Sequence, residues 1–552
     1  MPNLRGLTTE VSREHPLFIL GGSGPADTDP ESAYKLWKLI PDELKEYSVY
    51  PVEHFSVETM ERWAKFADKN DFPLLWQVRT WVPVWHRMWN NGMQGPGVGV
   101  DKVERLLSEH DSIKGVQICE LNCFGLSTEE RLYVSDLLKA CARQGRYLSW
   151  REGNDGCNIW VDAFLEKWFS DDVEAYGRYL FPQWEMNIPR NMYLCHDSVF
   201  GLWMAGFVEN WGLEPQSFYW LDCGFTDLNK PGENNNKGWR EGDRSKFPRT
   251  MWGQMILLGM NSGATVYNFE PRQDVLFTDE GAYPPAAHEV LFPLLEDIVR
   301  ERLIPSKEEV AEKVKVAYVA DFEDRREGET SDIDYYRGFA PDNDLFGRHG
   351  RRLSGSGSIY KGTYGLAHEY KMIPDTGRYY WIPVLPKYTR MEVMNRFERV
   401  ICPNQFWGEH DVRRFFDTIY PRSYEGDAYV TQVGKKVFLT NSNENIDVIQ
   451  RFSVTVEGVE IRGELGPNSY VIGTFEDRVF LHVNNYPGKV TELGISGVEG
   501  EVSSDPPGHV RATKGRGELK LEIKHIGATR VWIEPPRGRG GGVRRRKGGT
   551  RS

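Results

Sequence analysis

Short hydrophobic runs of strand length recur along the first 272 residues of the chain. They are rich in β-branched and aromatic side chains, which favour extended structure. The eight runs are PLFILGG (16–22), YSVYPVEH (47–54), PLLWQVR (73–79), IKGVQICEL (113–121), GRYLSWREG (145–153), RNMYLCHDS (190–198), SFYWLDCGF (217–225) and GATVYNFEPR (263–272).

Amphipathic segments with helical spacing lie between these runs. Examples are residues 56–70, 127–145 and 249–263, and a last helix is predicted over 289–303. Strands that alternate with helices predict a parallel sheet, and eight such units predict a closed (β/α)8 TIM barrel over residues 1–303. An open, doubly wound α/β sheet is the alternative.

The hydrophobic pattern changes after residue 303. Residues 304–425 combine short strands, VKVAYVA (314–320) and IPVLP (382–386), with polar loops, and we expect a barrel-associated region whose loops rim the cleft. Residues 426–536 read as short alternating strands separated by Gly, Asn and Pro, which is typical of an antiparallel β-sandwich. Structural support is its expected role, with carbohydrate binding as the alternative. The Arg/Gly-rich residues 537–552 are predicted to form a disordered tail.

Polar side chains cluster where the predicted strands end. They are Glu53, His54, Gln77, Arg79, Glu120, Arg151, Glu152, His196, Asp197, Asp222 and Glu270. Any barrel becomes polar where its strands leave the core, so this pattern alone requires no function. Acids beside deeply apolar runs, as in VQICEL, YWLDCG and VYNFEP, need partners or a raised pKa, and such acids concentrate at active sites. We therefore expect a catalytic rim at the carboxyl ends of the strands.

The composition narrows the class of partner. Aromatic residues make up 13% of the chain, and their flat rings can stack on the apolar faces of sugars. The candidate platforms, some of which must instead belong to the core, are Trp76, Trp85, Trp150, Trp160, Trp184, Trp211 and Trp220. A formal net charge of −12 argues against nucleic acid as a partner.

Membrane-spanning and export segments leave recognisable patterns in a sequence. No apolar run reaches the length of a membrane span, so no membrane partner is expected. The N-terminal segment MPNLRGLTTEVSREHP lacks the hydrophobic stretch of a signal peptide, so export would require a signal that is absent from this sequence. Seven scattered cysteines predict buried free thiols. We expect a monomer that is secreted or displayed at the cell surface.

Several catalytic chemistries lack their sequence signals. No G-x-S-x-G elbow follows a predicted strand, and neither Gly-rich stretch completes a nucleotide-binding motif. His54, His196, Asp197 and Asp222 could converge on a metal ion, but no H-x-H pair strengthens this interpretation, and we expect no metal or other cofactor. A carboxylate pair is the simpler chemistry, because one group protonates a leaving oxygen while the other attacks or activates water.

A series of motifs follows one another from residue 16 to residue 320. It comprises PLFILGG, KLIPDELKEYSVYPV, GVQICELNCFG, DSVFGLWMAGFVENWG, GATVYNFEP and RLIPSKEEVAEKVKVAYV. Each motif is weak alone, but their order is specific and resembles glycoside hydrolase family 98. The resemblance implies an endo-acting enzyme that inverts the anomeric configuration at an internal β-1,4 linkage. Its oligosaccharide or polysaccharide substrate would be a blood-group-type galactoside or a decorated xylan.

The resemblance also implies roles for individual residues. Carried over by position, Glu120 is the general acid, Asp222 the general base, and Glu270 its partner in holding the attacking water. Asp197 and Asp227 compete with Asp222, since the sequence departs from the family pattern around CELNCFG and YWLDCG. The residues expected to bind substrate are His54, Arg79, Trp150, Glu152, Asp197 and Trp220. A metal-dependent barrel hydrolase and a carbohydrate-binding barrel without catalysis are the rival classes.

Overall fold

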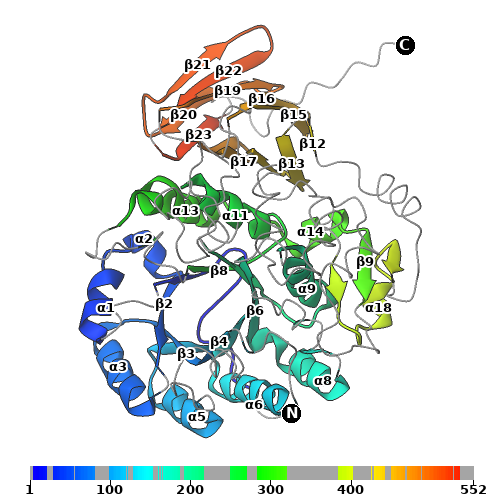
Figure 1. The fold of residues 1–552 in the computed structure, drawn as a ribbon. Coiled ribbons are helices and arrows are strands. Elements are labelled where there is room, and N and C mark those ends of the chain that lie inside the picture. The colour runs from blue at the N-terminus through cyan, green and yellow to red at the C-terminus, as the bar shows by residue number, and fades with distance from the viewer. Residues whose placement is uncertain are drawn as a thin grey trace, which may run out of the picture.

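The computed structural model of the chain places a barrel, a small parallel sheet and two antiparallel sheets in sequence order (Figure 1). It describes residues 4–21, 29–54, 56–80, 98–119, 121, 128–152, 160, 163–164, 166–186, 192–216, 249–269, 276, 283–319, 383–401, 424–425, 428–441, 449–466, 469–485, 488–525 and 527–534. Within these residues, no helix is long and apolar enough to span a bilayer.

Eight parallel strands close into a barrel (Figure 1). They are β1 (Leu17–Leu20), β2 (Ser48–Glu53), β3 (Leu74–Thr80), β4 (Ile113–Cys119), β5 (Tyr147–Glu152), β6 (Leu180–Met186), β7 (Gly212–Pro215) and β8 (Val266–Phe269). Each strand pairs with the next, and β8 closes the ring by pairing with β1, where Leu17 lies opposite Val266. The predicted (β/α)8 barrel is thereby confirmed over the open sheet.

Helices surround the barrel on its outer side (Figure 1). They are α1 (Pro30–Trp37), α2 (Asp42–Lys45), α3 (Val57–Asn70), α5 (Val100–Glu109), α6 (Thr128–Gln144), α8 (Lys167–Tyr176), α9 (Met192–Ala205), α11 (Thr250–Met260), α13 (Phe292–Arg300) and α14 (Lys307–Lys313). α3 shows how the local sequence specifies a helix, because the Ser56 hydroxyl accepts a hydrogen bond from the N–H of Thr59 at its start. Its buried residues, Met60, Trp63, Ala64 and Ala67, recur with helical spacing and face the core.

The sixth and seventh strands lie elsewhere than predicted. The run over residues 190–198 includes the first turns of α9, and the sixth strand is β6, with the sequence LFPQWEM. From residue 196 onward α9 is buried all round, and a run that is apolar on every side fits a buried helix as well as a strand. The seventh strand, β7, ends before the predicted run over residues 217–225, which lies outside the described residues.

A three-stranded parallel sheet follows the barrel. Its middle strand is β9 (Val316–Val319), flanked by β10 (Val384–Leu385) and β11 (Arg399–Ile401), and a short helix, α18 (Met391–Met394), precedes β11. Both β9 and β10 fall within predicted strands. The sheet approaches α9 closely at Gly201, where a Cβ atom would lie 1.9 Å from the carbonyl oxygen of Val384. Glycine has no Cβ and so permits this contact.

The C-terminal residues form two stacked antiparallel sheets, as predicted. Their strands are β12 (Tyr424–Glu425), β13 (Ala428–Val433), β14 (Lys436–Asn441), β15 (Gln450–Val456), β16 (Val459–Leu465), β17 (Ser469–Phe475), β18 (Val479–Asn484), β19 (Val490–Ser496), β20 (Glu501–Asp505), β21 (Val510–Lys514), β22 (Glu518–Lys524) and β23 (Thr529–Glu534). The seven-stranded sheet has the order β12-β13-β14-β17-β18-β23-β20, and the five-stranded sheet has the order β15-β16-β19-β22-β21.

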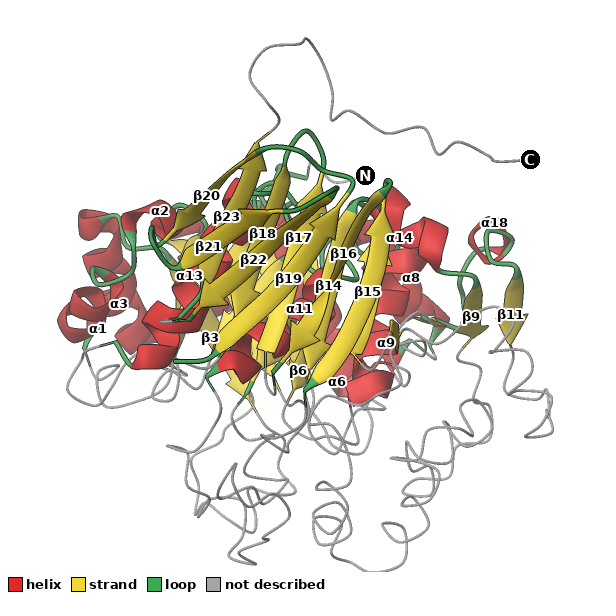
Figure 2. Cartoon of the chain, turned by 90° about the horizontal axis from the view of Figure 1, so that it is seen from above, coloured by secondary structure: helices red, strands yellow, loops and turns green. Residues whose placement is uncertain are grey.

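The seven-stranded sheet buries both of its faces. On β14, Val437 and Leu439 belong to the sandwich core, whereas Phe438 between them packs with the barrel core. On β17, Val471 likewise belongs to the sandwich core, and Ile472 packs with the barrel core. Since successive side chains of a strand point to opposite faces, this sheet lies between the five-stranded sheet and the barrel, next to α11 and α13 (Figures 1 and 2).

Polar contacts fasten the sandwich to the barrel helices. Asp297 of α13 lies 2.7 Å from Nδ1 of His482 and 2.7 Å from Nε of Arg530. Gly253 of α11 faces Tyr470 of β17, and a Cβ atom at this glycine would lie 2.3 Å from the tyrosine ring. These contacts join the sandwich to the barrel through buried side chains.

Candidate active site

Two of the three expected catalytic carboxyl groups directly follow a barrel strand. β4 ends at Cys119 and β8 ends at Phe269, one residue before Glu120 and Glu270 respectively. In the ring of eight strands, β4 and β8 are four places apart and therefore stand on opposite sides of the barrel. Outside the described residues lie Glu120, Asp222, Glu270, Trp220, Asp227 and the side chain of Arg79, so their roles stay predictions.

A buried polar cluster connects the ends of β5, β6, β7 and β8. Nη1 of Arg151 lies 2.6 Å from both carboxylate oxygens of Glu214, and the Asn268 amide donates to Glu214 at 3.2 Å. Gln216 donates from Nε2 to Glu214 at 2.9 Å and to Glu185 at 2.5 Å. Each of the five side chains is at most 2% exposed. Hydrogen bonds in such a water-poor setting hold the strand ends firmly.

Glu185 and Glu214 are acids that sequence reasoning missed. Both stand in apolar strands, in LFPQWEM and GLEP, so the signal that singles out Glu120 also marks them. The sequence-based prediction places the sixth and seventh strands elsewhere, so both residues fall between predicted strands and the signal is concealed.

Glu152 and Trp150, which were expected to contact substrate, lie buried beside α8. The Trp150 ring centroid is 4.8 Å from that of Trp160 and 6.4 Å from that of Phe169 on α8. Oε1 of Glu152 accepts hydrogen bonds from Nε1 of Trp150 at 2.7 Å and from the backbone N–H of Leu121 at 2.9 Å. Burial raises the pKa of Glu152 to about 8. Its partners are protein groups, which fits a supporting role better than sugar contact.

His54 directly follows β2 and is half-buried. Its carbonyl oxygen accepts a hydrogen bond from Nε1 of Trp76 at 2.7 Å, and its ring lies 5.2 Å from that of Trp63. Burial, assisted by the charge of Arg62, lowers the pKa of His54, so the imidazole is neutral at neutral pH. Its Nε2 has no hydrogen-bond partner among the described residues. Substrate binding by His54 stays a prediction that this placement permits.

His196, Asp197 and Ser262 form a buried hydrogen-bonded chain. Nδ1 of His196 lies 2.8 Å from Asp197 Oδ1, and Nε2 lies 3.0 Å from Ser262 Oγ. The order resembles a serine triad, but all three residues are 0% exposed, and Ser262 Oγ also donates to the Leu258 carbonyl at 3.1 Å. Burial lowers the pKa of His196 to about 3. An enclosed Asp197 is poorly placed to bind substrate or to replace Asp222 as the base.

The histidines suggested as joint metal ligands have different neighbours. His54 lies beside Trp63, whereas the His196 ring lies 5.3 Å from that of Trp184. Both ring nitrogens of His196 already take part in hydrogen bonds, and a metal ligand needs a free lone pair. In the part of the chain that the structure describes, no group of three or more His, Cys, Asp or Glu side chains could hold a metal ion.

Five of the seven candidate tryptophan platforms are core residues. The buried five, each at most 2% exposed, are Trp76, Trp150, Trp160, Trp184 and Trp211. Trp85 and Trp220 lie outside the described residues. Of the seven, only Trp85 and Trp220 therefore remain predicted platforms for sugar.

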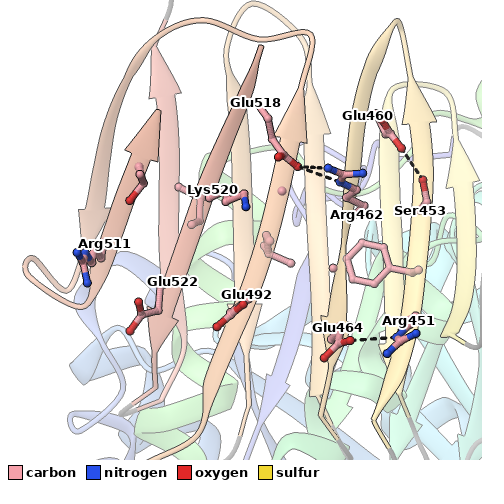
Figure 3. A pocket seen from close by; sticks show the side chains of 16 residues that line it. Arg451, Ser453, Glu460, Arg462, Glu464, Glu492, Arg511, Glu518, Lys520 and Glu522 are labelled. Carbon is pink, nitrogen blue, oxygen red and sulfur yellow. Dashed lines mark hydrogen bonds and ion pairs between the residues drawn. The ribbon is translucent and has the colours of Figure 1, made fainter. Parts of the chain in front are cut away.

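The outer face of the five-stranded sheet carries a hollow lined by charged side chains (Figure 3). Arg462 pairs with Glu518 at 2.7 Å, and Arg451 pairs with Glu464 at 3.0 Å. Phe452 is the one aromatic residue in its lining, and it is buried. Because the hollow presents no exposed ring, it offers no stacking platform for sugar. The role of the sandwich stays a prediction.

Comparisons with known proteins agree with this architecture. The model described as Glycosyl hydrolase family 98 matches residues 6–305, and that of the Glycosyl hydrolase family 98 C-terminal domain matches residues 307–494. A curated relative, the blood-group-substance endo-1,4-beta-galactosidase of Clostridium perfringens, is 24% identical over 540 residues, covering 86% of this chain. The chain spans about 60% of the length of that relative.

Solved structures share the fold. The catalytic module of a family 98 glycoside hydrolase from Streptococcus pneumoniae TIGR4, in complex with the LewisY pentasaccharide blood group antigen, superposes with a TM-score of 0.75 at 18% identity. The match covers 96% of this chain and 100% of that module. The module in complex with the H-disaccharide blood group antigen gives a TM-score of 0.74 at 17% identity, with the same coverage. Since the first family model alone matches more than half of the 552 residues, the chain belongs to glycosyl hydrolase family 98.

Proposed function

We propose that this protein is an endo-acting, inverting glycoside hydrolase that cleaves internal β-1,4-galactosidic linkages of blood-group-type glycans. One observation carries the proposal. In this family 98 barrel, β4 and β8 stand on opposite sides, and they end directly before Glu120 and Glu270 respectively. The name of the curated Clostridium perfringens relative supports the galactoside substrate. Decorated xylan is the other substrate that the family resemblance implies, and no contact among the described residues favours it.

In the proposed mechanism, Glu120 gives its proton to the glycosidic oxygen as the bond from that oxygen to the anomeric carbon breaks. A water molecule attacks the opposite face of the sugar and loses a proton to Asp222, while Glu270 holds the water in place. Inverting enzymes need roughly 6.5–9.5 Å between their two carboxyl groups to admit this water. Glu270 follows β8, on the side of the barrel opposite β4, and is therefore proposed to hold the water across the barrel from Glu120.

The buried cluster inside the barrel supports the rigidity that this chemistry needs. Asn268 stands two residues before Glu270 on β8, and its amide donates a hydrogen bond to Glu214. Arg151, at the end of β5, holds the same carboxylate. Catalytic groups carried on rigid elements keep their geometry, and a displacement of about 1 Å can cost about 100-fold in rate.

The proposed reaction needs no cofactor, because two carboxyl groups and water supply every proton transfer and the nucleophile. We also propose that the protein acts outside the cell, where such glycans occur, and that it does so as a monomer. Activity that survives EDTA supports the carboxylate mechanism, whereas activity lost to EDTA and restored by a divalent ion would favour the metal-dependent class.

The test is product analysis by mass spectrometry after incubation with blood-group A and B glycans, the LewisY pentasaccharide, arabinoxylan and glucuronoxylan. Release of an intact blood-group oligosaccharide from the galactosides alone is the expected result. Products from either xylan alone would show that the substrate is a polysaccharide of the plant cell wall and not a blood-group glycan. If the protein binds a glycan but produces no new reducing ends, it is a carbohydrate-binding barrel without catalysis.

A further inference from the structure

We infer that Glu152 is a positioning residue for the proton donor, because its carboxyl group holds the peptide group that joins Glu120 to Leu121. The inference rests on the proposed role of Glu120. It assigns Glu152 to the support of the catalytic acid in place of the contact with sugar that the sequence suggests.

The contact acts on the backbone of the catalytic residue itself. Oε1 of Glu152 lies 2.9 Å from the backbone nitrogen of Leu121, which donates the hydrogen bond. A peptide group is planar, so the N–H of Leu121 lies in one plane with the Cα atom of Glu120. Anchoring this N–H therefore restrains the backbone from which the Glu120 side chain projects.

The strand pairing brings the two residues together. In the parallel pair of β4 and β5, Cys119 lies opposite Arg151, so the end of β5 stands beside the point where β4 ends. Glu152 is the last residue of β5 and is 3% exposed. From the end of β5, its carboxyl group thus reaches Leu121, the residue that follows Glu120.

A second hydrogen bond fixes the carboxyl group. Nε1 of Trp150 donates to the same Oε1 at 2.7 Å. The Trp150 side chain is fully buried and packs against Trp160 and Phe169, so its indole N–H has a fixed direction. The core of the barrel therefore determines where Oε1 lies, and Oε1 in turn restrains the peptide after Glu120.

The chemistry of Glu152 suits support rather than proton transfer. Burial raises its pKa to about 8, so it is protonated and uncharged over the acidic and neutral range. A neutral neighbour adds no negative charge beside the proton donor, and glutamine reproduces both its shape and its acceptor oxygen.

The test compares Glu152→Leu, which lacks the acceptor, with Glu152→Gln, which keeps it. Asp68→Leu is the matched control, because the Asp68 carboxylate accepts the backbone N–H of Ser112 at 3.0 Å, at the opposite end of the same strand. Trp150→Phe keeps an aromatic ring in the core and leaves the hydrogen bond between Glu152 and Leu121 in place, but it lacks the indole N–H that makes the second hydrogen bond. It serves as a milder variant if Glu152→Leu does not fold.

Three readouts are needed: kcat on the natural glycan, kcat on a dinitrophenyl glycoside of the same sugar, and hydrogen exchange at the Leu121 amide. We expect Glu152→Leu to lose about 100-fold in kcat on the glycan, through misplacement of the acid. The loss on the dinitrophenyl substrate should be much smaller, since that leaving group needs no proton. Glu152→Gln should recover most of kcat, and Trp150→Phe should show the pattern of Glu152→Leu in weaker form.

Exchange at Leu121 should accelerate in Glu152→Leu and remain slow in Glu152→Gln and Asp68→Leu. Equal losses on both substrates, a similar kcat loss in Asp68→Leu, or unchanged exchange at Leu121 would each overturn the inference. A wild-type protein that cleaves none of the glycans would instead refute the proposed function, and the exchange measurement would still decide whether Glu152 holds this peptide.

Discussion

Nη1 of Arg151 lies 2.6 Å from both carboxylate oxygens of Glu214, and both side chains are buried inside the barrel. The pair joins the ends of β5 and β7 at the edge of the barrel where the catalytic groups are expected. Burial removes the hydration of both charges, and their mutual attraction offsets this cost only while both are present. The carboxyl ends of β5 and β7 are therefore held by a matched pair of buried charges.

We predict that Arg151→Met lowers the free energy of unfolding by about 3–5 kcal/mol, because it leaves the Glu214 charge buried without its guanidinium. The double variant Arg151→Met/Glu214→Leu should be more stable than Arg151→Met, since both charges are then absent. Urea unfolding of the wild type, the two single variants and the double variant measures the coupling. Additive losses in this cycle would show that the pair does not act as a unit.

The fold was largely predictable from the sequence, because alternating apolar strands and amphipathic helices have distinct periods. The sixth strand was misplaced for a physical reason. On β6, Gln183 and Glu185 make buried hydrogen bonds with Ser149 and Gln216, whereas the apolar run after β6 belongs to the buried helix α9. Periodicity identifies one-sided burial and fails where an element is buried on every side or polar within the barrel.

The candidate site was predictable in part. A carboxyl group directly after an apolar strand marks Glu120 and Glu270 from sequence. The same signal cannot tell whether a side chain faces the barrel interior or the helices, and Glu152 illustrates this limit. The partners of Glu152, the Leu121 N–H and the Trp150 indole, follow from strand pairing, which a single sequence does not state.

We predict that Gly253→Ala weakens the junction between barrel and sandwich. The added Cβ would lie 2.3 Å from the Tyr470 ring, and overpacking of this kind costs about 1–3 kcal/mol. Thermal unfolding of Gly253→Ala should begin at a lower temperature, and Gly253→Ala/Tyr470→Leu should restore part of the loss. Gly6→Ala is a control without a steric clash or backbone strain, since no atom lies within 4 Å of a Cβ at Gly6 and its φ is not positive. A melting temperature of Gly253→Ala equal to that of the wild type would contradict the tight contact.

Stability should depend on pH through Glu152. Its pKa rises from 4.5 to about 8 on folding, so between these values the folded state keeps a proton that the unfolded state releases. The resulting stabilisation is fully present below pH 4.5 and is lost as the pH rises toward 8, at no more than about 1.4 kcal/mol per pH unit. Glu152→Gln cannot titrate, so it should gain stability relative to the wild type from pH 5 to pH 8. Urea unfolding at both pH values measures this difference, and a constant difference would show that Glu152 does not hold the proton.

Ser262→Ala should retain the hydrolytic rate of the wild type. The Ser262 hydroxyl is enclosed with His196 and Asp197, so the chain of three resembles a triad without access to substrate. Its loss should lower stability by about 1 kcal/mol, as expected for one buried hydrogen bond. Kinetics on the cleaved glycan check the prediction, and a loss of more than 100-fold with the fold intact would return a serine nucleophile to consideration.

The anomeric configuration of the first product, followed by proton NMR during cleavage of a blood-group glycan, tests the central claim most directly. Wild-type protein and the matched control Glu129→Gln, altered at an exposed position on α6, should both release the α-anomer from the β-linkage before mutarotation. Glu120→Gln should release no product while its melting temperature stays that of the wild type. A first product with the β-configuration would contradict inversion, and near-wild-type turnover by Glu120→Gln would remove Glu120 from the mechanism.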